Sequence, residues 1–98
     1  MKYILDIKIS AKAGVLDAFD YYEAIREGLG KRFLDYWETH IGIVEENPLL
    51  FHKKYKDFRQ ALIKPYPYHI IYKIEKNTIA VYKIIYAGKS PRKRYNKK

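Results

Sequence analysis

The stretch YHIIYKIEKNTIAVYKIIY, residues 68–86, decides the fold of this chain. Residues 68–75 and 78–86 each alternate along a period of two and are rich in isoleucine and tyrosine, which is typical of β-strands. Lys76–Asn77 separates them and predicts a tight hairpin turn, because asparagine tolerates positive φ. In the second strand, strict alternation places Ala80, Tyr82, Ile84 and Tyr86 on one face and Ile79, Val81, Lys83 and Ile85 on the other.

Two further strands are predicted on the N-terminal side of this hairpin. Residues 58–64 are strand-like, and Pro65 and Pro67 fit the bend that follows them. Residues 3–9 alternate as well, and they must join the same sheet, since a lone strand cannot satisfy its backbone groups. Residues 48–57 show no period, and we interpret them as a loop.

The intervening residues have the three-to-four spacing of amphipathic helices. The first helix is predicted from Ser10, a suitable N-cap, to about residue 27, and the second over residues 31–46. Gly28 and Gly30 interrupt them, so the pair forms a helical hairpin. The expected apolar stripes are Val15, Ala18, Tyr22, Ile25 and Leu29 in the first helix, and Phe33, Trp37, His40, Ile41 and Val44 in the second.

The resulting order is β-α-α-β-β-β. This order predicts a two-layer α+β domain, in which an antiparallel sheet carries the N-terminal helical hairpin on one face. The other face is left to solvent or to a partner. The 98 residues suffice for one domain, which we expect over residues 1–88, with a basic tail over residues 89–98.

Composition excludes several classes of protein. There is no cysteine, and His40, His52 and His69 are scattered, so neither a metal site nor another cofactor is expected. No apolar run approaches the ~18 residues needed to span a bilayer. We see no secretory signal at the N-terminus, which predicts a cytoplasmic protein.

Charge is distributed unevenly along the chain. Residues 1–50 hold six Lys/Arg and nine Asp/Glu, a net charge of −3, whereas residues 51–98 hold fourteen Lys/Arg and two acids, a net charge of +12. Such asymmetry concentrates positive potential on the surface that the second half builds. Polyanions are natural partners of that surface, and a solvated face that only aids solubility is the alternative.

Several segments, in this order, resemble toxins of the RelE/ParE superfamily. The resemblance covers roughly residues 3–95 and agrees with the β-α-α-β-β-β order derived above. The segments that carry it are Asp17–Glu23 with Gly28–Phe33, Asn47–Pro48, Asp57–Arg59 with Pro65–Tyr72, and Ile79–Ile85 followed by Pro91.

The resemblance implies the toxin of a type II toxin–antitoxin pair, a plasmid stabilisation protein. An antitoxin, whose flexible and often acidic segment wraps the toxin, would neutralise it. ParE-like members inhibit DNA gyrase, and RelE-like members cleave mRNA in the ribosome as metal-independent endoribonucleases. A non-toxic nucleic-acid-binding module of the same fold is a further alternative. A homodimer and a toxin–antitoxin hetero-oligomer are both compatible with an exposed sheet face.

Candidate site residues follow from the chemistry of the two branches. RNA cleavage needs a base, an acid and cations at the phosphate, and His69 and Tyr95 are the candidate catalytic residues. Gln60 and Leu62 stand where RelE-like toxins place cations, which favours gyrase inhibition. The candidate cations for binding nucleic acid or another target are Lys64, Lys83, Lys89, Arg92, Lys93 and Arg94.

Arg59 has a structural interpretation. Strand alternation places it with Ala61 and Ile63, beneath the helices. A buried cation needs an anion, so we expect an ion pair between Arg59 and either Asp20 or Glu23.

Overall fold

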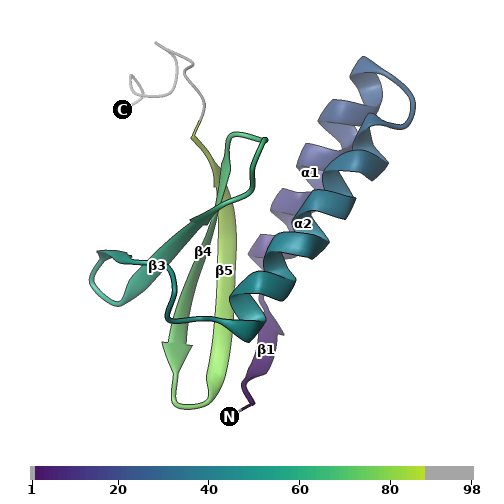
Figure 1. The fold of residues 1–98 in the computed structure, drawn as a ribbon. Coiled ribbons are helices and arrows are strands. Elements are labelled where there is room, and N and C mark those ends of the chain that lie inside the picture. Colours follow the sequence, from purple (N-terminus) through teal and green to yellow (C-terminus); the bar gives the residue numbers. More distant parts are fainter. Residues whose placement is uncertain (1, 88–98) are drawn as a thin grey trace.

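A computed structural model describes residues 2–87 of the chain. It contains two helices and a five-stranded sheet (Figure 1). The elements are β1 (Ile4–Ile7), α1 (Ile9–Ile25), α2 (Leu29–Glu46), β2 (Lys53–Tyr55), β3 (Phe58–Leu62), β4 (Tyr68–Glu75) and β5 (Thr78–Tyr86). The helical hairpin packs on one side of the sheet, which confirms the two-layer α+β architecture. Within residues 2–87, no helix is long and apolar enough to cross a membrane.

The strand order in the sheet is β1-β5-β4-β3-β2. Strands β2, β3, β4 and β5 pair antiparallel with one another in that order, as expected for a meander. Strand β1 pairs in parallel with β5, so the sheet is mixed rather than wholly antiparallel. The helical hairpin separates β1 from the meander in sequence, and a long connection of this kind permits parallel pairing, which a short hairpin turn cannot.

Several boundaries differ from the sequence-based prediction; for example, α2 begins at Leu29, a residue that was predicted to belong to the first helix. Residues 53–55 form the edge strand β2 within the segment expected to be a loop. Helix α1 begins at Ile9, and its N-cap is Lys8 instead of Ser10. The Ser10 hydroxyl donates a hydrogen bond to the Tyr82 carbonyl oxygen (2.6 Å), so it links α1 to β5.

The core lies between the helices and one face of the sheet. The predicted apolar stripes supply most of the core residues that the helices contribute, although Ile25, at the end of α1, is exposed. Ala61 and Ile63 are buried, as strand alternation predicted. The buried cluster comprises Ala11, Val15 and Ala18 of α1, Phe33, Trp37, Ile41 and Val44 of α2, and Ala61, Ile63, Ile70, Tyr72, Ile79, Val81 and Ile84 of the sheet region.

Glu23 organises the turn between the helices. Its two carboxylate oxygens accept hydrogen bonds from the backbone N–H groups of Gly28 (3.0 Å) and Gly30 (2.8 Å), close to the start of α2. Gly28 has a φ of 94°, a left-handed conformation that favours glycine. At Gly30, a Cβ atom would lie 2.7 Å from the Phe19 ring, so the helices can approach closely only because this residue is glycine.

A β-bulge in β5 changes which side chains face outward. Tyr72 pairs with Val81, while the preceding Ile71 pairs with Lys83, and Tyr82 is left as the extra residue. Strict alternation therefore fails along β5. Ile79 and Val81 join Ile84 in the core, instead of sharing a face with Lys83 as predicted.

Candidate functional site

The sheet face opposite the helices carries a groove of about 470 Å³. Residues from both ends of the described chain meet in it: the first turn of α1 supplies one side chain, and β2 to β5 supply the others. The lining residues are Ser10, Lys54, Tyr55, Phe58, Gln60, Ile71, Tyr82, Lys83 and Ile85. We call this concavity the open-face groove.

Aromatic rings form part of its surface. The Phe58 and Tyr82 rings meet edge to face, with centroids 5.2 Å apart. The Tyr82 hydroxyl donates a hydrogen bond to Glu75 (3.3 Å), and the Lys73 ammonium lies 5.1 Å from the centre of the Phe58 ring. Tyr55, at the edge strand, is exposed. The groove therefore offers ring faces and edges to an apolar or planar group.

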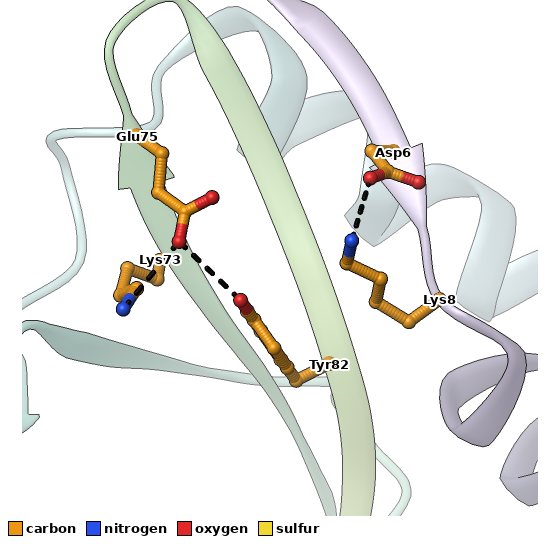
Figure 2. Close-up of polar contacts among 5 residues, drawn as sticks. All are labelled: Asp6, Lys8, Lys73, Glu75 and Tyr82. Atoms are coloured by element: carbon orange, nitrogen blue, oxygen red, sulfur yellow. Dashed lines mark hydrogen bonds and ion pairs between the residues drawn. The ribbon is translucent and has the colours of Figure 1, made fainter.

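The acids of this region are already paired (Figure 2). Asp6 and Lys8 form an ion pair at 2.9 Å, and Glu75 and Lys73 form another at 3.4 Å. The hydrogen bond to Asp6 is also the main reason why the pKa of Lys8 is raised. These contacts neutralise the charges around Tyr82.

Lys54 and Lys83 differ from the cations in those pairs. Both line the groove, both are exposed, and neither has an ion-pair partner among residues 2–87. The groove is thus largely apolar and aromatic, with two unneutralised ammonium groups. Such a surface favours a ligand that combines apolar groups with negative charge.

His69, the predicted catalytic residue, lies in β4 between Leu62 of β3 and Ile85 of β5. It is half-buried and is not among the groove-lining residues. Burial lowers its pKa, and the nearby positive charge of Lys54 lowers it further. The imidazole is therefore biased toward its neutral form. Tyr95, the other predicted catalytic residue, lies outside the described residues.

The predicted target-binding cations are only partly brought together. Lys83 lines the groove, as does Lys54, which the sequence analysis did not single out. Lys64 is exposed, follows the end of β3, and does not line the groove. The other predicted contacts, Lys89, Arg92, Lys93 and Arg94, fall outside the part of the chain that the structure describes.

Arg59 does not form the expected ion pair. Its guanidinium donates a hydrogen bond to the Phe51 carbonyl oxygen (2.6 Å) and so holds the segment that leads into β2. Glu23 is occupied by the backbone of the helical turn, and Asp20 is exposed. A backbone carbonyl thus supplies the acceptor that we had assigned to a carboxylate.

The groove residues that sequence reasoning missed come from the start of α1, from β2 and, like Tyr82, from the longer strands. Lys54 and Tyr55 were assigned to a loop because the three-residue strand is too short to show a period. In the sequence, a lysine stands next to a tyrosine at positions 54–55 and again at positions 82–83, and this was the available signal for a binding surface. Within residues 2–87, no group of His, Asp and Glu side chains is arranged to hold a metal ion.

Residues 5–91 match the family model described as the ParE toxin of the type II toxin–antitoxin system parDE. The chain belongs to the ParE toxin family. No curated protein matches the sequence. The fold of this ParE-family chain is similar to that in the chromosomal ParDE toxin–antitoxin system from P. aeruginosa. The TM-score is 0.80 at 10% identity, over 89% of this chain and 98% of that one.

Two RelE structures share the fold of this ParE-family chain. The archaeal RelE–RelB complex from Pyrococcus horikoshii has a TM-score of 0.62 at 16% identity, over 92% of this chain and 100% of that one. The isolated E. coli RelE toxin also has a TM-score of 0.62, at 18% identity, over 91% of this chain and 88% of that one. At these identities the likeness concerns the fold alone.

Proposed function

We propose that this ParE-family toxin arrests growth by binding DNA gyrase as a protein inhibitor, without cleaving nucleic acid. The make-up of the open-face groove is the observation that supports this function. Its lining is largely apolar and aromatic, as in the centres of protein–protein interfaces, and Lys54 and Lys83 add positive charge. Such a surface can bind a folded protein without a chemical step.

The arrangement of titratable groups supports the same choice. Cleaving RNA without a metal requires a base at the 2′-hydroxyl, an acid at the leaving oxygen and cations at the phosphate. Among residues 2–87, His69 is the histidine that lies within a strand of the sheet, and it has no hydrogen-bonded carboxylate to orient it. The hydroxyl of Tyr82 is directed to Glu75.

We also propose that a cognate antitoxin neutralises the chain and that both act in the cytoplasm. The structures of similar fold include a ParDE system and a RelE–RelB complex. An acidic antitoxin segment would find unpaired cations at Lys54 and Lys83. A flexible segment loses conformational entropy when it becomes ordered on binding, and this loss lowers its affinity. Complementary charges therefore matter for binding.

Purified gyrase provides the direct test. The wild-type chain is expected to block supercoiling of relaxed plasmid, and Lys83→Glu is expected to weaken this inhibition. Arg32→Glu, on the exposed side of α2, serves as the matched control. Full supercoiling at saturating toxin would contradict the gyrase proposal. Normal growth of cells that accumulate the soluble chain would contradict toxicity itself and favour the nucleic-acid-binding module.

One observation favours mRNA cleavage as the second candidate. His69 lies on the same open face as Lys54 and Lys83, so an imidazole and two ammonium groups could approach one phosphodiester. In this alternative Tyr95, Arg92 and Arg94 would complete the acid and the phosphate contacts. Mapping transcript 5′ ends after induction tests it: codon-linked cuts that disappear in His69→Gln would support cleavage over gyrase inhibition.

A further inference from the structure

A second concavity lies on the helical side of the sheet, at the end of α1. It has a volume of about 400 Å³ and is lined by Tyr21, Tyr22, Ile25, Tyr68 and Tyr86. Three elements build it, because α1 supplies the first three residues, β4 supplies Tyr68 and β5 supplies Tyr86. We call it the tyrosine pocket.

Contacts between the rings hold the pocket in shape. Tyr21 and Tyr22 meet edge to face with centroids 5.1 Å apart, and Tyr68 and Tyr86 do so at 5.4 Å. Tyr22 is fixed further by the Tyr66 ring, at 5.0 Å. Tyr21 is 60% exposed, so its ring is accessible to a ligand while its neighbours are anchored.

The pocket has the electrostatics of a cation site. The faces of aromatic rings carry negative potential, and among residues 2–87 no residue that lines the pocket is a cation. Burial raises the pKa of Tyr22 to about 12, so its hydroxyl stays neutral at physiological pH. Burial also raises the pKa of Tyr68, and Tyr86 and Tyr21 contribute in the same direction. The smallest contribution comes from Asp17, which places a carboxylate within electrostatic reach of the rings.

We propose that the tyrosine pocket binds an arginine or lysine side chain of a protein partner. A cation over several tyrosine rings gains cation–π energy, and a guanidinium can in addition stack flat on a ring. The charge of the chain fits this occupant, since residues 1–50, which supply Asp17 and three of the five lining residues, carry a net charge of −3.

The two concavities therefore differ in the charge that they prefer. The open-face groove has unpaired lysines and favours negative groups, whereas the tyrosine pocket favours positive ones. A partner that contacts both would have to present charges of opposite sign to the two sides of the sheet. This inference does not depend on the choice between gyrase and mRNA as the target.

Two matched probes test the pocket on the full chain. N-acetyl-arginine methylamide is the cationic probe, and N-acetyl-citrulline methylamide has nearly the same shape without the charge. Titrations followed by the NMR signals of the tyrosine rings should show weak saturable binding of the arginine probe and several-fold weaker binding of the citrulline probe. Tyr21→Leu should weaken arginine binding about two- to five-fold, the equivalent of one exposed cation–π contact.

Two controls separate the ring from other effects. Tyr21→Phe keeps the ring and should bind the arginine probe like the wild type. Tyr55→Leu, at an exposed tyrosine of the open-face groove, should also leave binding unchanged.

Equal affinity for both probes, or unaltered binding by Tyr21→Leu, would overturn the proposal. Tighter binding in the full-length double variant Arg92→Gln, Arg94→Gln would also overturn it, by assigning the pocket to the chain's own basic end. None of these readouts measures growth arrest or supercoiling.

Discussion

The hydroxyl of Tyr72 donates a hydrogen bond of 2.6 Å to the carbonyl oxygen of Pro48. Tyr72 lies in the middle of β4, and Pro48 follows the end of α2, so this bond fastens the helical hairpin to the centre of the sheet. Both residues are buried. Burial raises the pKa of Tyr72 to about 12, because the phenolate would lose its solvation there.

Tyr72→Phe is expected to lower the free energy of unfolding at pH 7 by about 1–2 kcal/mol, since the Pro48 carbonyl loses its buried donor. Denaturant titration monitored by the fluorescence of Trp37 measures this change. An unaltered unfolding midpoint would show that the hydrogen bond contributes nothing net.

The same substitution should alter the response to alkali. The folded-state pKa of Tyr72, about 12, exceeds the ordinary value of 10.0. The protonated Tyr72 therefore contributes its full share of the free energy of unfolding below pH 10, and this contribution is lost as pH rises toward 12. Tyr72→Phe removes this loss, and the stability gap between the two proteins should narrow over that range. Tyr22, whose pKa is also raised to about 12, preserves part of the alkaline sensitivity in both. A gap that stays constant from pH 9 to 12 would contradict this expectation.

Glu23→Ala should destabilise the domain by about 1–2 kcal/mol, because the amides of Gly28 and Gly30 lose a charged acceptor at the start of α2. For a domain of this size, that corresponds to a fall of several degrees in Tm. Glu23→Gln keeps one acceptor oxygen and should lose less. Exposed Asp20, substituted by Ala, is the neighbouring control. Thermal unfolding followed by circular dichroism measures the fall in Tm. Equal falls for the Glu23 and Asp20 variants would show that the contacts of the turn do not stabilise the domain.

His69→Gln should change the pH dependence of stability in the acid range. The folded-state pKa of His69 is lowered below 6.5 by burial and by Lys54. The unfolded chain therefore binds a proton more readily, and the wild type loses stability as pH falls from 6.5 through the folded-state pKa. His69→Gln should lack this loss, whereas His52→Gln, at an exposed histidine, should retain it. Urea midpoints between pH 7.5 and 5 measure the effect, and parallel curves for wild type and His69→Gln would rule it out.

The double substitution Lys54→Glu, Lys83→Glu should reduce growth inhibition strongly, because it reverses both unpaired charges of the open-face groove. It should barely change stability, since both side chains are exposed and neither has an ion-pair partner within residues 2–87. Lys31→Glu together with Arg32→Glu, on α2, reverses the same number of charges away from the groove. Plating efficiency after induction compares the two double variants at matched expression. Equal toxicity of the two would show that the charges of the groove are not needed for growth inhibition.

The helices and the main strands could be predicted from the sequence because their periods of 3.6 and two extend over many residues. The direction of β1 could not, because nothing local to residues 4–7 fixes pairing with a strand more than seventy positions later. Strand β2 was missed because three residues carry no period.

The side chains of the groove were harder to predict than the fold. The bulge at Tyr82 shifts the alternation of β5 by one residue, so Lys83 faces the groove without Ile79 and Val81. No turn residue marks such a bulge in the sequence. The partner of Arg59 was also inaccessible to sequence reasoning, because any backbone carbonyl can accept from a guanidinium, and only the folded path of the chain brings Phe51 to it.

The pairing of β1 with β5 also matters while the protein is being made. Of the five strands within residues 2–87, translation produces β1 first and its neighbour β5 last, and the open-face groove needs Ser10 near the former and Tyr82 and Lys83 of the latter. A nascent chain that lacks residues 78–86 has neither a closed sheet nor a finished groove. Ribosomes add about 5–20 residues per second, so the groove can form only some seconds after its first lining residue has been made. The strand order thus delays completion of the open-face groove until residues 78–86 have been made.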